Sequence, residues 1–118
     1  MRKILITGVA GLLGSRLADW IINNTNYKVV GIDDLSGGFS ENINRNVEFY
    51  KFNLIDLQAL KGVFEKENIE TVYHFAAYAA EGLSPFIRKY NYENNLIAST
   101  NLITCCIQHE ISRFVFAS

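Results

Sequence analysis

The chain has 118 residues, the size of one ordinary domain, and its 49% hydrophobic and 19% charged residues predict a packed core rather than disorder. Its eleven basic residues are scattered among twelve acidic ones, and the net charge of −1 argues against a nucleic-acid partner. No apolar run approaches the roughly 20 residues that span a bilayer, so no membrane partner is expected. The N-terminus leads directly into a strand pattern, without the apolar stretch of a signal peptide.

The cysteines point to a reducing compartment. Cys105 and Cys106 are adjacent within a helical pattern, where a disulfide between them would be badly strained. Two adjacent thiols also lack the spacing of zinc ligands, so no metal site is predicted. We interpret both as small, buried or half-buried apolar residues of a cytoplasmic protein.

The first third of the chain alternates short apolar runs with an amphipathic stretch. Ile4–Thr7 has the composition of a strand, and Lys28–Ile32 is almost continuously apolar, as in a parallel strand covered on both faces. Helical spacing after Gly11 predicts one apolar face, made of Leu13, Leu17, Trp20 and Ile21. The polar segment 36–46 contains two consecutive glycines and is expected to be a loop.

The same alternation continues through the middle of the chain. Val47–Phe52 and Thr71–Phe75 are the next predicted strands. Between them Asp56 is placed to cap a helix with an apolar face of Leu57, Leu60, Val63 and Phe64. Ser84-Pro85 is a typical helix start, and the helix is expected to reach about His109. Its predicted face consists of Tyr92, Leu96, Ser99, Ile103 and Cys106.

A fifth strand, Arg113–Ala117, completes a β-α-β-β-α-β-α-β order. This alternation predicts an α/β fold with a parallel sheet wrapped by helices on both faces. Right-handed crossovers then favour a doubly wound sheet with strand order 3-2-1-4-5. The sequence stops at Ser118, directly after a strand that should lie inside the sheet, so residues 1–118 are expected to be an incomplete domain.

A glycine pattern joins the first strand to the first helix. Residues 7–14 read Thr-Gly-x-x-Gly-x-x-Gly, in the strand–turn–helix context that such a pattern needs. Gly8 would permit a sharp turn, Gly11 would let the backbone approach a pyrophosphate, and Gly14 would allow close helix–strand packing. The helix start would bind the phosphates through its free N–H groups and dipole. The pattern is also compatible with a plain tight turn and does not choose among nucleotide folds.

Acidic residues follow the second strand. Asp33 and Asp34 come about twenty residues after the glycine turn, where a carboxylate accepts hydrogen bonds from an adenosine ribose. A carboxylate there also repels a 2′-phosphate, which favours NAD over NADP. Asp is common in turns, so a solvated loop start is the alternative for either residue.

These blocks, taken in order, resemble the extended short-chain dehydrogenase/reductase family, especially the NAD-dependent epimerase/dehydratases. The matching blocks are Thr7 to Gly14, Asp33-Asp34-Leu35-Ser36-x-Gly38, Asn53-Leu54-x-Asp56, His74-Phe75-Ala76-Ala77, Asn94-Asn95-Leu96-x-Ala98-Ser99 and Arg113 to Ser118. The resemblance covers the whole chain and implies a Rossmann-type fold, NAD as the cofactor, a nucleotide sugar as the substrate of a full-length form, and a helical dimer interface that includes the long helix.

The resemblance also implies a set of cofactor-binding residues: Gly8, Gly11, Leu12, Leu13, Gly14, Asp33, Asp34, Leu35, Ser36, Asn53, Leu54, Phe75, Ala76, Ala77 and Asn94. Asn53 and Leu54 would flank the adenine. Phe75 to Ala77 would line the groove beside the pyrophosphate and nicotinamide ribose, with Asn94 near the nicotinamide. Asn95 has two open interpretations, a site residue or an anchor, and His74 is expected to be a satisfied core residue.

Three departures from the family pattern stand out. Most relatives have Asp at the position of Asn53, although Asn keeps an acceptor oxygen for the adenine amino group. The usual Gly-Thr pair is Ala98-Ser99. The family's catalytic Tyr-x-x-x-Lys pair is missing, because no Tyr follows Tyr92 and no Lys follows Lys89. No catalytic residue is therefore assigned.

Three hypotheses follow for function. In the first, the chain is the cofactor half of a nucleotide-sugar epimerase or dehydratase and is inactive alone. In the second, it is a stand-alone dinucleotide-binding or sensor module. In the third, it is a remnant that binds nothing. The intact glycines and Asp33 argue against the remnant. Exposed apolar faces are expected to cause homodimerisation or another form of self-association.

Overall fold

The fold was obtained as a computed structural model, which describes residues 2–75 and 85–116, with the backbone alone for 85–92. Five parallel strands form one sheet in the order β3-β2-β1-β4-β5, which confirms the predicted doubly wound topology. The strands are β1 (Lys3–Thr7), β2 (Lys28–Asp33), β3 (Glu48–Lys51), β4 (Ile69–His74) and β5 (Arg113–Phe116). The helices are α1 (Leu12–Asn24), α2 (Leu57–Lys66) and α3 (Pro85–Gln108), with a short 3₁₀ turn, η1 (Ser40–Asn42), in the β2–β3 connection.

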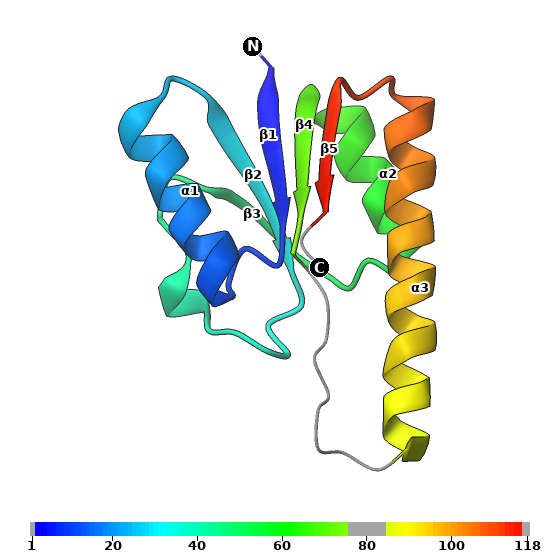
Figure 1. The fold of residues 1–118 in the computed structure, drawn as a ribbon. Helices are drawn as coiled ribbons and strands as arrows, with labels where there is room; N and C mark the ends of the chain where they lie inside the picture. The colour runs from blue at the N-terminus through cyan, green and yellow to red at the C-terminus, as the bar shows by residue number, and fades with distance from the viewer. Residues whose placement is uncertain (1, 76–84, 117–118) are drawn as a thin grey trace.

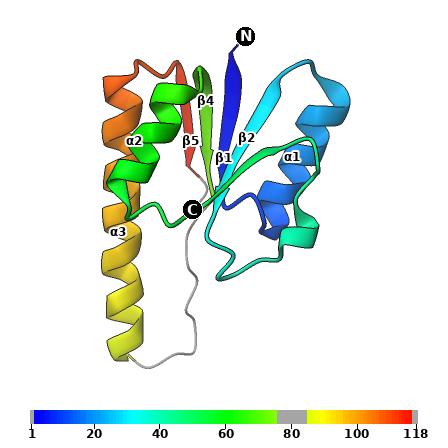
Figure 2. The same cartoon turned by 180° about the vertical axis from the view of Figure 1, so that it is seen from behind.

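The helices form one layer on each side of the sheet. Helix α1 lies on one face, and α2 and α3 lie side by side on the other (Figures 1 and 2). All five strands run the same way, so their carboxyl ends meet at a single edge. The strand order reverses between β1 and β4, and open α/β sheets bind ligands at the carboxyl edge beside such a reversal.

Two hydrophobic clusters hold the layers together. The larger one fills the space between the sheet and α2 and α3, and includes Leu5, Val30, Leu60, Val72 and Leu102. The smaller one lies between the sheet and α1, and includes Ile4, Ile6, Val9, Ala18 and Ile21. Because β1 contributes alternate residues to both clusters, it is the most completely covered strand.

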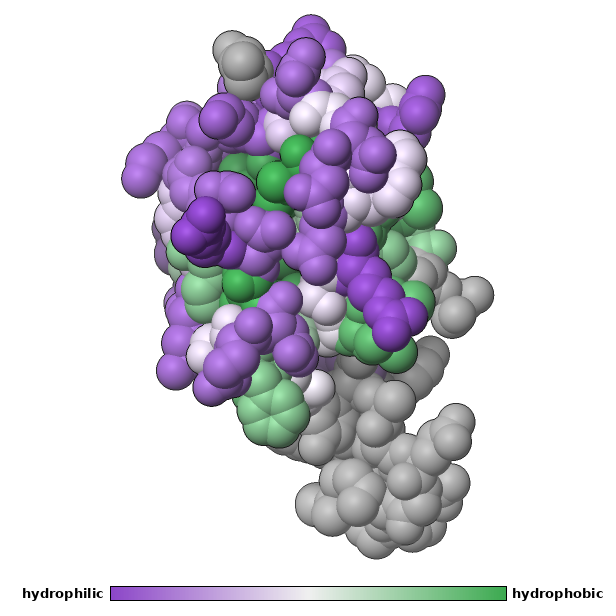
Figure 3. Space-filling model, turned by 90° about the vertical axis from the view of Figure 1, so that its left-hand side faces the viewer, coloured by the Kyte–Doolittle hydropathy of each residue, from purple (hydrophilic) through white to green (hydrophobic). Residues whose placement is uncertain are grey.

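The predicted apolar face of α1 is wrong for two of its four residues. Leu13 and Trp20 are 62% and 59% exposed, whereas the buried residues of α1 are Gly14, Ser15, Ala18 and Ile21. Small side chains let the helix axis approach the sheet closely, and they determine the contact face. The side of the molecule that includes α1 is mostly hydrophilic and is interrupted by apolar patches (Figure 3).

The predicted face of α3 is wrong for Leu96 and Ile103 and right for Cys106, which is buried. Leu96 and Ile103 are 57% and 46% exposed, and the buried residues include Ala98, Leu102, Cys105 and Cys106. Ser99 is half-buried, and the side chain of Tyr92 lies outside the described residues. The two cysteines are free thiols, as predicted, and burial raises the pKa of Cys106 to about 12.

The predicted start of α2 is confirmed. The Asp56 side chain accepts a hydrogen bond of 3.1 Å from the Ala59 backbone N–H, and Leu60, Val63 and Phe64 are buried. The predicted cap of α3, Ser84, lies outside the described residues. None of the described helices is both long enough and apolar enough to cross a membrane.

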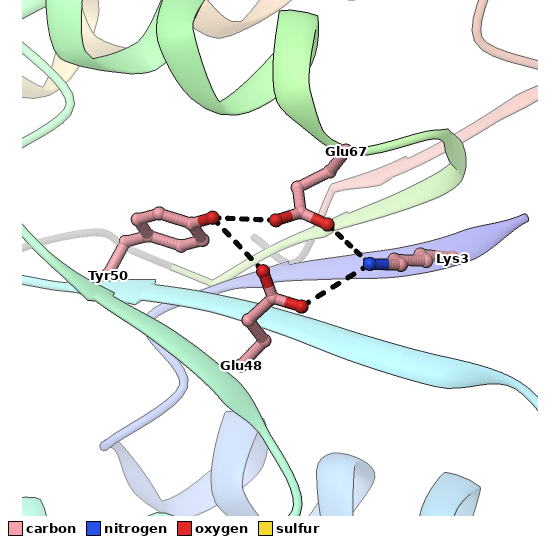
Figure 4. A network of polar contacts seen from close by, with 4 residues as sticks. All are labelled: Lys3, Glu48, Tyr50 and Glu67. Carbon is pink, nitrogen blue, oxygen red and sulfur yellow. Dashed lines mark hydrogen bonds and ion pairs between the residues drawn. The ribbon is translucent and has the colours of Figure 1, made fainter.

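A polar network crosses the sheet on the side of α2 (Figure 4). Lys3 Nζ of β1 lies 2.5 Å from Glu67 Oε1, at the end of α2, and 3.3 Å from Glu48 Oε1 of β3. The Tyr50 hydroxyl lies 2.6 Å from Glu67 and 3.1 Å from Glu48. The four side chains therefore connect β1, β3 and α2 across the intervening β2.

Candidate dinucleotide-binding site

The glycine turn lies directly after β1. The Gly8 N–H donates to the Ile32 carbonyl at 2.8 Å, and Gly8 has a φ of 73°, in the left-handed region that favours glycine. A Cβ atom at Gly14 would lie 2.2 Å from the Gly8 carbonyl oxygen. The chain can therefore turn sharply at Gly8, and α1 can pass over the end of β1, because both positions lack a side chain.

The first turn of α1 is open to an anion. Gly11 is the N-cap residue and provides no side-chain cap, and the first turn contains no acidic residue. The first N–H groups of a helix have no partner within the helix and carry its positive partial charge. The side chains of Leu12 and Leu13 are 65% and 62% exposed, so they do not cover the helix start with core packing. This arrangement suits a phosphate group.

The carboxylate of Asp33 anchors the glycine turn. Its Oδ2 accepts from the Ala10 backbone N–H at 2.9 Å, and its Oδ1 accepts from Leu35 N–H at 2.8 Å. The Ala10 carbonyl in turn accepts a hydrogen bond of 3.1 Å from Asn42 Nδ2. The end of β2 and the loop after it thus fix one residue of the turn from both sides.

Asp34 has its own set of partners beside Asp33. Its Oδ1 accepts hydrogen bonds from the Ser36 backbone N–H at 2.9 Å and from Ser36 Oγ at 2.7 Å. Its Oδ2 accepts a hydrogen bond from Asn53 Nδ2 at 2.9 Å. Burial raises the pKa of Asp34, but the hydrogen bonds from Ser36 and Asn53 outweigh burial and lower it below the usual value. Leu35, which follows the two acids, has a φ of 66°, a left-handed conformation that a non-glycine residue rarely adopts.

The end of β3 brings Asn53 and Leu54 to the same edge. Asn53 is exposed, and its Oδ1 accepts from Ile55 N–H at 3.0 Å. The Leu54 side chain is only 4% exposed and belongs to the larger core cluster. Its carbonyl accepts a hydrogen bond of 3.0 Å from Asn101 Nδ2 of α3, and this contact connects the loop to the helix.

At the switch point, β4 is tied closely to β1. The Phe75 N–H lies 3.1 Å from both the carbonyl oxygen and Oγ1 of Thr7, and His74 Nδ1 lies 2.6 Å from the same hydroxyl. His74 Nε2 lies 3.1 Å from Ser99 Oγ of α3. Burial lowers the pKa of His74 to about 4, so its ring is neutral near pH 7. His74 is therefore the satisfied core residue that the sequence suggested.

The described part of the predicted set gathers along one edge of the sheet. It includes the glycine turn, Asp33 to Ser36, Asn53, Leu54 and Phe75. Ala76 and Ala77 lie outside the described residues, and Asn94 and Asn95 are half-buried on α3. Sequence reasoning missed the roles of Asn42 and Asn101, because neither belongs to a motif and both partners are more than thirty residues away.

The chain belongs to the NAD dependent epimerase/dehydratase family, whose model matches residues 4–118. It is 35% identical to dTDP-D-glucose 4,6-dehydratase from Dictyostelium discoideum, over 100% of the chain and 29% of that protein. It is 34% identical to UDP-glucose 4-epimerase from Bacillus subtilis, over 98% of the chain and 36% of the relative. The chain thus spans about a third of the length of these curated relatives.

Solved structures agree with the family assignment. The crystal structure of UDP-glucose 4-epimerase from Thermotoga maritima, with UDP-glucose, matches 98% of this chain and 37% of its own, with a TM-score of 0.92 and 35% identity. The Thermus thermophilus UDP-glucose 4-epimerase, solved in complex with NAD, matches 100% of this chain and 37% of its own, with a TM-score of 0.91 and 31% identity. The similarity therefore extends over the whole described fold.

Proposed function

We propose that these 118 residues bind NAD at the carboxyl edge of the sheet. The observation that carries the proposal is the uncapped, acid-free start of α1 beside the glycine turn, with Asp33 at the end of the adjacent strand. The pyrophosphate would bind to the N–H groups of Leu12, Leu13 and Gly14. This site fits the group because a close backbone approach and unneutralised helix N–H groups are what a pyrophosphate needs.

The adenosine end of NAD would lie over the ends of β2 and β3. Asp33 already accepts two backbone N–H bonds, and its two oxygens retain lone pairs for the ribose hydroxyls. Asp34, the next residue, adds a second carboxylate, and Leu35 and Ser36 would continue the lining on the same loop. Two adjacent carboxylates would repel a 2′-phosphate, so we expect NAD to bind more tightly than NADP.

The nicotinamide end would lie on the other side of the switch point. Phe75 is fixed there by Thr7, and the resemblance extends the lining to Ala76 and Ala77, with Asn94 near the nicotinamide.

At the adenine end, Asn53 would accept a hydrogen bond from the adenine amino group. Leu54 would contribute its backbone, because its side chain is in the core.

We further propose that the parent activity is that of a nucleotide-sugar epimerase or dehydratase. Such enzymes use NAD to take up and return a hydride. The 118 residues contain six tyrosines, and none is followed four residues later by lysine. The pair that the family uses for proton transfer is therefore not provided by these residues, and we expect no epimerase or dehydratase turnover from this chain alone.

A stand-alone dinucleotide-binding or sensor module is the second candidate. Such a module would use the same site and would need no proton-transfer residue. Detectable turnover of UDP-glucose or dTDP-glucose by the purified chain would contradict the inactive-alone proposal.

We also propose a cytoplasmic location, because both thiols are free, and association with a second copy through α3.

Gly11→Ala tests the proposed site. A Cβ atom there would have its nearest contact at 3.4 Å, to the Gly8 carbonyl oxygen, so the fold should tolerate it. The same methyl group would stand where the pyrophosphate must approach, and we expect NAD affinity to fall about tenfold or more in isothermal titration calorimetry. Gly62→Ala on α2 is the control, since nothing lies within 4 Å of its Cβ position. Equal affinities for the wild type and Gly11→Ala would reject this site.

A further inference from the structure

Asp34 and Asn53 form a contact between the loops that follow two neighbouring strands. Asn53 Nδ2, after β3, donates to Asp34 Oδ2, after β2, at 2.9 Å. Asp34 cannot easily turn away, because its other oxygen accepts two bonds from Ser36, at 2.9 and 2.7 Å. The left-handed Leu35, with a φ of 66°, fixes the backbone that presents both acids.

These contacts determine which end of the Asn53 amide is oxygen. An amide has an oxygen acceptor and a nitrogen donor of nearly the same shape, so only its partners define its orientation. The ionised Asp34 carboxylate can only accept, and it therefore requires the nitrogen. The Ile55 N–H, 3.0 Å away, can only donate and requires the oxygen. Both partners select the same orientation.

A purine bound at this edge would meet that oriented amide. A dinucleotide that places its ribose at the end of β2 has its base over the ends of β2 and β3, where Asn53 is exposed. Adenine carries an amino donor at its C6 position, whereas hypoxanthine carries a carbonyl acceptor there. The Asn53 oxygen has one lone pair left beside Ile55 N–H, and it can accept from the amino group.

We propose that Asp34 is a positioning residue that holds the Asn53 amide with its oxygen as the acceptor, so that the pair selects adenine over hypoxanthine. Asn53 thus performs the acceptor role that a carboxylate would perform at this position, while the negative charge is carried by its neighbour. This inference rests on the proposed NAD binding and deepens it, because it names the residue that sets base specificity.

The test compares two dinucleotides by isothermal titration calorimetry. NAD and nicotinamide hypoxanthine dinucleotide differ only in the base: adenine has an amino group at C6 and an unprotonated N1, whereas hypoxanthine has a carbonyl at C6 and a proton on N1. We expect the wild-type chain to prefer NAD by about fivefold to tenfold, the value of one hydrogen bond. Asp34→Ala removes one of the two partners that orient the amide and leaves only the Ile55 N–H, so it should lower this preference to about twofold. Adding Asn53→Asp to Asp34→Ala restores an acceptor in every rotamer and should restore the preference.

Glu41→Ala is the charge-matched control, because it removes an exposed carboxylate from η1 in the same β2–β3 connection. It should change both affinities equally and leave the ratio unchanged. A merely structural role of Asp34 would weaken both dinucleotides together and would not alter the ratio. Circular dichroism confirms that each variant is folded before titration.

The outcomes separate this inference from the proposed function. If the wild type binds NAD but Asp34→Ala keeps its full preference, the positioning role of Asp34 is wrong and NAD binding stands. If the wild type binds both dinucleotides equally, the base-selection role of the pair is wrong and NAD binding again stands. If neither dinucleotide binds, the proposed function fails and the inference fails with it.

Discussion

Gly14 lies where the first turn of α1 passes over the end of β1. A Cβ atom there would stand 2.2 Å from the Gly8 carbonyl oxygen and 2.9 Å from its carbon, so the backbone itself must move. We expect Gly14→Ala to lower the free energy of unfolding by about 2 kcal/mol, a typical cost of overpacking. Urea denaturation measures the change.

Gly62 provides the matched control, because it lies within α2 and has nothing within 4 Å of its Cβ position. Alanine has the higher helix propensity, so Gly62→Ala should raise the free energy of unfolding by about 0.5–1 kcal/mol. Equal effects of the two substitutions would show that the close approach at Gly14 does not govern its stability.

The neutral His74 ring makes stability depend on pH. Its pKa is lowered by burial from 6.5 to about 4, so between these values the unfolded chain binds the proton and the folded chain does not. Stability should therefore rise with pH across this window and fall by up to about 3 kcal/mol as the pH is lowered from 6.5 to 4. Urea midpoints measured at half-unit pH intervals follow this loss.

His74→Gln separates this contribution from the other titrating groups. The Gln amide can still meet the Ser99 hydroxyl near the position of Nε2, which lies 3.1 Å from it, and it takes up no proton; the Nδ1 contact with Thr7 is lost. The variant should be less stable near pH 7 and should show a flatter profile between pH 6.5 and 4. An unchanged slope would mean that the pKa of His74 is the same in the folded and unfolded chains.

At the scale of secondary-structure elements, the Lys3–Glu48–Tyr50–Glu67 network holds β1, β3 and α2 in register (Figure 4). The Glu67 side chain is 2% exposed, and its charge is matched by Lys3, which is 25% exposed. Glu67→Gln leaves Lys3 without its nearest counter-charge. We expect a loss of about 2 kcal/mol in the free energy of unfolding at pH 7, measured by urea denaturation.

The pH dependence of this loss identifies Glu67 as its source. Burial raises the pKa of Glu67, but hydrogen bonds that involve Glu48, Lys3 and Tyr50 outweigh burial and lower it from 4.5 to about 2. A lowered carboxyl pKa stabilises the fold above about pH 4.5, and this stabilisation is lost as the pH falls towards 2. The wild type and Glu67→Gln should therefore converge in stability near pH 2. Glu65→Gln, an exposed neighbour, should track the wild type throughout.

The elements themselves were largely predictable from the sequence, but their contact faces were less so. Hydrophobic runs and the Asp56 cap locate the strands and α2 to within a residue or two. The face of α1 was mistaken because periodicity counts large apolar residues, whereas packing against a sheet selects small ones such as Gly14 and Ala18. On α3, the buried Ala98 and Leu102 lie outside the predicted stripe, whereas Cys106 within it is buried as predicted.

The site was predictable where a motif ties a residue to its role. The glycine turn and Asp33 follow from spacing and strand order alone. The Asp34–Asn53 bond joins residues nineteen apart, and the Lys3–Glu67 pair joins residues sixty-four apart. Such polar contacts depend on side-chain directions across neighbouring strands, and no local pattern in the sequence encodes them.

At the scale of the whole molecule, the reversal of strand order organises both the site and the core. The crossover from β1 to β2 places α1 on one face, and the crossovers into β4 and β5 place α2 and α3 on the other (Figures 1 and 2). At the carboxyl edge beside this reversal, the glycine turn follows β1 and Phe75 follows β4. The bonds of Thr7 to Phe75 and His74 hold these two strand ends together.

The outer face of α3 leads to a prediction about assembly. Leu96, Ile103 and Ile107 recur at helical spacing and are 57%, 46% and 73% exposed. An apolar stripe of this kind on a helix surface is stabilised by packing against a second copy, so we expect the apparent mass in sedimentation velocity to rise with concentration. Ile103→Lys would bury a charge in such a contact and should shift the chain towards the monomer.

Trp20→Lys is the matched control for this prediction, since Trp20 is 59% exposed on α1, across the sheet from α3. If the stripe on α3 drives association, Trp20→Lys should sediment like the wild type at every concentration. If Trp20→Lys dissociates the assembly and Ile103→Lys does not, association uses the face of α1 instead. A wild-type chain that stays monomeric at all concentrations would show that neither helix face is sufficient, because the free energy of burying three exposed side chains does not exceed the entropy lost on association.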